Sequence, residues 1–156
     1  MDKPRILQAI IAKLTADAEL YFRAARAAQY EATDEQSKAE NKYDTRGLEA
    51  SYLARGQSRQ AAETEQALTD FRALPARLFA KEAAIDLGAI VELKGRRERM
   101  LFLVGPSAGG TEVTVDGEEI TVITPQSPLG QQLMGRRTGD NVTLPSGEER
   151  RVGCVE

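Results

Sequence analysis

The sequence contains no histidine and only one cysteine, Cys154. Histidine is the commonest general base and metal ligand, and structural zinc sites are built from cysteine and histidine. Their scarcity argues against a structural zinc site, and a single cysteine excludes an intramolecular disulfide, which suits a reducing compartment. Any chemistry must therefore rest on carboxylates, lysine, tyrosine or hydroxyl groups.

The chain also lacks a basic excess and a long apolar run. It has 21 Lys and Arg against 24 Asp and Glu, a net charge of −3. Affinity for free nucleic acid comes mainly from neutralised phosphates, so we expect any work near nucleic acid to depend on a protein partner. No run approaches the roughly 18 apolar residues of a membrane span. The first residues lack a signal-peptide layout. These features predict a cytoplasmic protein that enters no membrane.

Proline and glycine are scarce in the first half. Between residues 2 and 74 the only proline is Pro4 and the only glycines are Gly47 and Gly56, while helix-forming residues dominate. Apolar residues recur at helical spacing in two stripes: Ile6, Ile10, Leu14, Tyr21 and Ala24 or Ala28, then Leu48, Tyr52, Leu68, Phe71 and Leu74. This pattern predicts an antiparallel coiled-coil hairpin over residues 1–76, with arms of about 45 to 55 Å.

The position of the hairpin turn stays open. Symmetry favours a turn near residue 40, whereas turn chemistry favours Asp44 to Gly47, where Gly47 could take a positive φ. A long hairpin could also serve as a dimerisation element. We expect Tyr52 to be a packing residue.

The pattern changes after Leu74-Pro75. Short β-prone runs at 89–94, 100–104, 112–115 and 120–124 are separated by glycine and proline. Ser127 as N-cap, Pro128 as first residue and Gly135 as terminator predict a short helix. Two further strands are expected at 141–144 and 150–155, joined by a turn at 145–147, with Cys154 buried. The predicted fold class is α+β: the helical hairpin, then a small β-rich domain over residues 77–156.

The stretch from Ile123 to Val142 resembles the C-terminal domain of the GreA/GreB family of transcription elongation factors. In that family a strand leads into a Ser-Pro-Leu turn, a short helix, a Gly-Asp-x-Val strand and a Pro-x-Gly hairpin. The matching segments here are 127–130, 133–136, 139–142 and 145–147, preceded in family order by 87–93 and 103–106. The resemblance covers about residues 86–156.

This resemblance implies an FKBP-like fold for the second domain and bacterial RNA polymerase as the partner. The turn Ser127, Pro128, Leu129 and Gly130 would dock at the rim of the polymerase's secondary channel. The factor would act as a monomer and rescue backtracked complexes by stimulating transcript cleavage. It would be an accessory factor with no cofactor of its own, because the cleavage chemistry belongs to the polymerase. Without the resemblance, Ser127 and Pro128 are a plain helix cap.

In the family, acidic side chains at the hairpin tip help to hold a second Mg²⁺ in the polymerase active centre, near the 3′ end of the nascent RNA. The family tip reads Asp-x-x-Glu-Asn, but this chain has Ser37 three residues before Glu40-Asn41. A second alignment places Asp44 and Glu49 at the tip. The candidate tip carboxylates are therefore Glu40, Asp44 and Glu49, supported by Asn41, Lys42 and Arg46.

Two other interpretations remain open. The tip could enter the channel without promoting cleavage and regulate initiation or pausing; Lys42 and Arg46 would then contact nucleic acid, polymerase carboxylates or a nucleotide phosphate. An FKBP-like fold also suggests a prolyl isomerase, although fold alone is a weak warrant. The second half has only Phe79 and Phe102 as aromatic residues, which is poor for an isomerase site.

Overall fold

The computed structural model describes residues 1–33, 45–80, 82–95 and 98–156. They form two compact units. The hairpin unit is Leu14–Leu68, and the sheet unit combines Met1–Lys13 with Thr69–Glu156. This division follows packing, whereas the boundary at residues 76 and 77 followed the change in sequence pattern.

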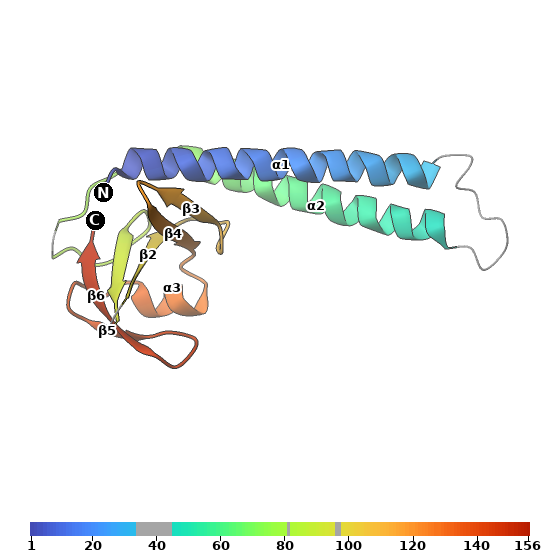
Figure 1. The fold of residues 1–156 in the computed structure, drawn as a ribbon. Helices are drawn as coiled ribbons and strands as arrows, with labels where there is room; N and C mark the ends of the chain where they lie inside the picture. The colour runs from blue at the N-terminus through green and yellow to red at the C-terminus, as the bar shows by residue number, and fades with distance from the viewer. Residues whose placement is uncertain (34–44, 81, 96–97) are drawn as a thin grey trace. The chain divides into compact units, whose positions relative to one another are not determined.

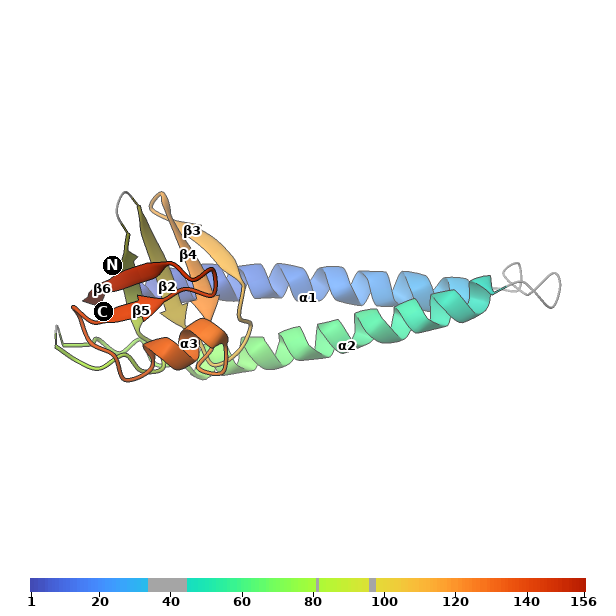
Figure 2. The ribbon, with the colours of Figure 1, turned by 90° about the horizontal axis from the view of Figure 1, so that it is seen from below.

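Two long helices confirm the predicted hairpin. Helix α1 spans Lys3–Thr33 (31 residues) and α2 spans Arg46–Ala73 (28 residues). They run antiparallel and side by side (Figures 1 and 2). The turn predicted at Asp44 to Gly47 is wrong in part, because Arg46 and Gly47 lie in the first turn of α2 and Gly47 does not have a positive φ. A turn near residue 40 falls outside the described residues.

The seam of the hairpin unit is built mainly from alanine. The buried residues are Leu14, Ala18, Ala25 and Ala28 on α1, and Ala50, Ala61, Ala67 and Leu68 on α2. The predicted inward positions Leu48 and Tyr52 are wrong, since these side chains are 57% and 63% exposed. Ala50 takes the inward position between them, because residues two apart on a helix point in different directions.

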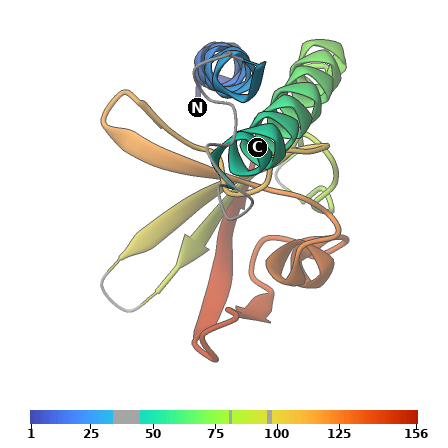
Figure 3. The same cartoon turned by 90° about the vertical axis from the view of Figure 1, so that its right-hand side faces the viewer.

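Six strands form one twisted sheet (Figure 3). Their order is β3-β4-β2-β1-β6-β5. All neighbours pair antiparallel except β2 and β4, which are parallel. The strands are β1 (Ile90–Lys94), β2 (Arg99–Val104), β3 (Glu112–Val115), β4 (Glu118–Ile123), β5 (Asn141–Thr143) and β6 (Glu149–Val155). Each predicted strand is confirmed with its ends moved by no more than two residues.

Both faces of the sheet are used for packing. On one face, the side chains of Val91, Leu93, Phe102 and Val152 form a core with Leu129 and with Leu133 of α3, the helix Pro128–Leu133. The other face packs against the start of α1 and the end of α2, which belong to the sheet unit. There Ile6, Ile10 and Phe71 are buried, as are Ile120 and Val122 of β4.

Gly105 shows how closely this second layer packs. A Cβ atom at Gly105 would lie 2.7 Å from Cζ of Phe71 and 2.8 Å from Cγ1 of Val122. Only glycine therefore lets the end of β2 approach the Phe71 ring. The first turns of α1 and the last turn of α2 thus complete the β domain.

Candidate functional site

The predicted docking turn is a tightly determined helix start. The Ser127 hydroxyl donates to the main-chain oxygen of Thr124 (2.8 Å) and accepts the N–H of Gly130 (3.0 Å). This confirms Ser127 as the N-cap and Pro128 as the first helical residue. A Cβ at Gly130 would lie 1.8 Å from the Thr124 oxygen, so the turn requires glycine there.

The four predicted docking residues differ in accessibility. Leu129 and Gly130 are buried, Ser127 is half-buried, and Pro128 is exposed. Leu129 packs into the core beneath the helix. A partner approaching this turn would therefore meet Pro128 and the edge of Ser127, while Leu129 and Gly130 shape the turn from inside.

The segment after α2 is fixed by interactions within the sheet unit. Lys3, which is 2% exposed, donates from Nζ to the main-chain oxygens of Arg77 (2.6 Å) and Glu156 (2.9 Å). Its ammonium lies 4.7 Å from the centre of the Phe79 ring, and the Arg77 guanidinium lies 4.3 Å from it. Burial lowers the pKa of Lys3 from its usual value, and the nearby Arg77 charge acts in the same direction, while the Glu156 carboxylate opposes both.

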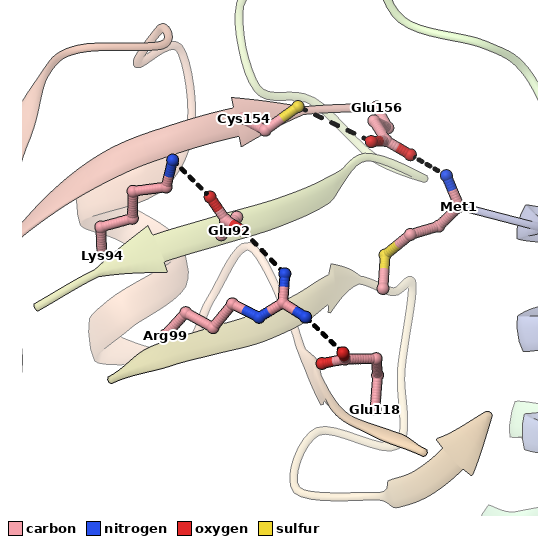
Figure 4. A network of polar contacts seen from close by, with 7 residues as sticks. All are labelled: Met1, Glu92, Lys94, Arg99, Glu118, Cys154 and Glu156. Carbon is pink, nitrogen blue, oxygen red and sulfur yellow. Dashed lines mark hydrogen bonds and ion pairs between the residues drawn. The ribbon is translucent and has the colours of Figure 1, made fainter. Parts of the chain in front are cut away.

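A polar network lies on β1, β2, β4 and β6 (Figure 4). The Glu92 carboxylate accepts from Lys94 Nζ (3.1 Å) and from Arg99 (3.4 Å), and Arg99 also pairs with Glu118. Cys154, predicted to be buried, is half-buried, and its sulfur lies 3.7 Å from Glu156 Oε1. Burial first, and then the Glu156 charge, raise the pKa of this thiol. Such a thiol is a poor nucleophile, because the thiolate is the reactive form.

The predicted tip residues are only partly described. Glu40, Asn41, Lys42 and Asp44 lie outside the described residues. Glu49 is exposed in the first turn of α2, and its Oε1 accepts a hydrogen bond from the Thr45 hydroxyl (2.8 Å). The Glu49 N–H donates to the Thr45 carbonyl (2.9 Å). Arg46 is exposed in the same turn.

Each helix of the hairpin unit has a basic and aromatic side, which the sequence interpretation missed. We call these two sides together the basic face. Because residues three and four apart share a side of a helix, the following residues lie away from the seam on one side of each helix: Phe22, Arg23, Arg26 and Tyr30 on α1, and Leu48, Tyr52, Arg55 and Arg59 on α2. All eight are exposed.

Charge is distributed unevenly around and along the hairpin unit. Within 20–33 and 45–60 the described acidic residues are Glu31 and Glu49. Arg23 pairs with Glu19 and Arg59 with Glu63, whereas Arg26 and Arg55 form no ion pair with any described residue. The spacing of Arg26 and Arg55 relative to Tyr30 and Tyr52 was readable from the sequence, but only once the buried seam is known.

No helix among the described residues is long and apolar enough to cross a membrane. No group of three or more cysteine or acidic residues in the same part of the chain could hold a metal ion.

Comparisons with known proteins bear on this architecture. Residues 80–154 match the family model described as "Transcription elongation factor, GreA/GreB, C-term". Residues 80–154 are therefore similar to the C-terminal domain of the GreA/GreB family.

Solved structures similar to the chain are GreA homologues. GreA factor homolog 1 (Gfh1) of Thermus thermophilus has 25% identity over 95% of both chains, with a TM-score of 0.39. Gfh1 of Thermus aquaticus has 25% identity over 96% of this chain and 92% of that chain, with a TM-score of 0.39. A further structure of the transcription factor Gfh1 has 26% identity over 95% and 94%, with a TM-score of 0.38. No curated protein matches the chain.

Proposed function

We propose that this protein binds bacterial RNA polymerase at the secondary channel, as a monomer, and rescues backtracked complexes by stimulating the polymerase's own transcript cleavage. The observation that carries the proposal is an exposed carboxylate, Glu49, in the first turn of α2, at the tip of a hairpin on a GreA/GreB-type domain. Within the hairpin unit α1 contributes residues 14–33 and α2 residues 46–68, which correspond to about 30 to 35 Å at about 1.5 Å per residue, a length suited to reaching into a channel.

The chemistry requires hard oxygen ligands rather than histidine. Mg²⁺ is usually held by one or two carboxylates together with substrate phosphates, and a two-metal site stabilises the attacking and leaving oxygens of a phosphoryl group. Glu49 fits this requirement, because in the described part of the chain its Oε2 has no hydrogen-bond partner. Glu40 and Asp44 are the other candidates, with Asn41, Lys42 and Arg46 as supporting residues.

The basic face supports a contact with nascent RNA. Arginine neutralises phosphates, and exposed aromatic rings stack on unpaired bases without regard to sequence. Arg26 and Arg55, which have no ion-pair partner among the described residues, and the exposed rings of Tyr30 and Tyr52 supply both elements. The displaced RNA 3′ segment of a backtracked complex would follow this face. The net charge of −3 makes such binding dependent on the polymerase.

The direct test is transcript cleavage in a stalled, backtracked complex of the cognate polymerase. Wild type should shorten the RNA, and at least one of Glu40→Ala, Asp44→Ala and Glu49→Ala should reduce the rate by about 10²-fold or more with unchanged binding, the loss typical of a transition-state group. Glu63→Ala, which removes an acid of α2 nearer Leu68, should act like wild type. Binding without any cleavage by wild type would contradict the proposal.

A channel-binding regulator without cleavage activity is the second candidate. It is favoured by Ser37, which stands where the family tip has aspartate. Such a factor would bind the polymerase and block cleavage by a conventional Gre protein in a competition assay. Lys42→Ala and Arg46→Ala should then relieve the block, while the carboxylate variants should not.

A further inference from the structure

We propose that Thr45 is a positioning residue that holds the Glu49 carboxylate at the tip of the hairpin, ready to act in the polymerase active centre. This inference rests on the proposed cleavage function. It assigns a role to a residue that is neither acidic nor part of the tip pattern used to choose candidates. It concerns Glu49, the candidate carboxylate that lies among the described residues.

The hydroxyl of Thr45 is directed at the carboxylate. A threonine before a helix usually accepts a hydrogen bond from a main-chain N–H of the first turn. Here the Thr45 Oγ1 instead donates to Glu49 Oε1 at 2.8 Å, and no main-chain N–H of the described residues donates to it. The interaction therefore fixes the glutamate side chain in addition to the helix start.

The backbone of the same turn fixes where this pair sits. The Glu49 N–H donates to the Thr45 carbonyl (2.9 Å), which makes it the first main-chain bond of α2. Ala50 is buried in the seam and Gly47 is half-buried beside it, so the rotation of this turn is set. Glu49 consequently lies to one side of the seam, and its carboxylate extends one turn toward the tip to reach Thr45.

The bond leaves the carboxylate able to act. One oxygen, Oε1, is held by the hydroxyl, while Oε2 has no partner among the described residues. A free glutamate side chain loses rotamer entropy when it must adopt one geometry, and a pre-formed bond removes part of that cost before the reaction. We expect the bond to raise the cleavage rate and to lower the Mg²⁺ concentration needed for half-maximal rate, without changing polymerase affinity.

The experiment uses the full chain with cognate polymerase on a backtracked complex. Thr45→Val keeps the shape and removes the hydroxyl, Thr45→Ser keeps the hydroxyl, and Thr33→Val is the matched control, because that hydroxyl bonds only main-chain oxygens at the end of α1. We expect Thr45→Val to slow cleavage about threefold to tenfold, the range of one hydrogen bond, and to raise the Mg²⁺ concentration for half-maximal rate. Thr45→Ser and Thr33→Val should retain the wild-type values.

Coupling between the two residues gives the second criterion. Combining Thr45→Val with Glu49→Ala should be no worse than Glu49→Ala alone, because the hydroxyl acts only through the carboxylate. In the isolated protein, Thr45→Val should shift the side-chain carboxyl resonance of Glu49 in a carbon NMR spectrum, whereas Thr45→Ser should leave it near its wild-type position.

Each failure has a separate signature. If Glu40→Ala or Asp44→Ala abolishes cleavage and Glu49→Ala does not, the cleavage function stands and the role of Thr45 is overturned. Wild-type rate and Mg²⁺ dependence for Thr45→Val overturn it as well. If wild-type protein binds but never promotes cleavage, the proposed function fails and this inference fails with it.

Discussion

At the scale of single residues, the helix-start turn at 127–130 depends on Gly130 having no side chain. Ser127, Pro128 and Leu129 are each replaceable by residues that cap, start or pack a helix moderately well. Gly130 has no such substitute, because the Thr124 oxygen occupies the space that a Cβ would need, at 1.8 Å. The sequence pattern identified this turn correctly, but only the structure separates the exposed Pro128 from residues that shape it from inside.

We predict that Gly130→Ala destabilises the protein by at least about 2 kcal/mol, because the turn must move to relieve the overlap. Gly56→Ala is the matched control, since a Cβ there has nothing within 4 Å and alanine is the better helix former. It should stabilise by about 0.5 to 1 kcal/mol. Urea unfolding curves measure both. Equal midpoints for the two variants would show that the turn is more compliant than its geometry indicates.

At the scale of elements, the sequence predicted the strands well. It predicted the two helices, but it assigned the buried side of α2 wrongly in part. Strand runs such as 112–115 end at glycine-containing turns, which leaves little freedom in their limits. The seam of α2 was misassigned because Leu48 and Tyr52 are more apolar than Ala50, although alanine packs there. Hydrophobicity alone cannot distinguish an apolar side chain that is buried in the seam from one that is exposed on the helix surface. The tip could not be assigned either, because neither of two alignments of its acids matches the family pattern fully.

We predict that Arg26→Ala combined with Arg55→Ala weakens the salt dependence of binding to backtracked polymerase. Each lost phosphate contact on single-stranded RNA should reduce the slope of log affinity against log salt by about 0.7, so about 1.4 for the pair. Both residues are exposed, so folding stability should change by less than about 0.5 kcal/mol. Binding isotherms at several salt concentrations provide the measurement.

The control for this prediction lies on α1, away from Arg26. Glu31→Gln removes one charge outside the basic face, and it should leave the slope nearly unchanged. A complex without extruded RNA should show little difference between wild type and the arginine variant. If the slope of log affinity against log salt does not change on backtracked complexes, the basic face does not bind RNA phosphates.

At the scale of the whole molecule, the two compact units differ in what holds them together. The sheet unit buries Leu, Ile, Val and Phe side chains on both faces of its sheet. The hairpin unit buries mainly alanine, which removes much less apolar surface from water per residue. The division was not evident from sequence, because residues 1–13 read as the start of a long helix whatever they pack against.

We predict that amide hydrogen exchange separates the units. Amides of α1 and α2 within Leu14–Leu68 should exchange through openings of lower free energy than amides of β1, β2 and β4. Exchange of the intact protein at near-neutral pH, followed residue by residue by NMR, would show two groups of protection factors. A single uniform group would mean that the molecule opens only as a whole.

The assembly of the sheet unit from both ends of the chain constrains how the protein is made. Residues 14–68 form one continuous segment, so the hairpin has all its parts once α2 has emerged from the ribosome. Ile6 and Ile10 must wait for β4, and the sheet itself for β6, before they have a surface to cover. A nascent chain therefore carries the apolar side chains of Ile6 and Ile10 exposed through most of its synthesis. The seam that follows them along the chain is rich in alanine, so it offers few large apolar side chains to which they could bind wrongly.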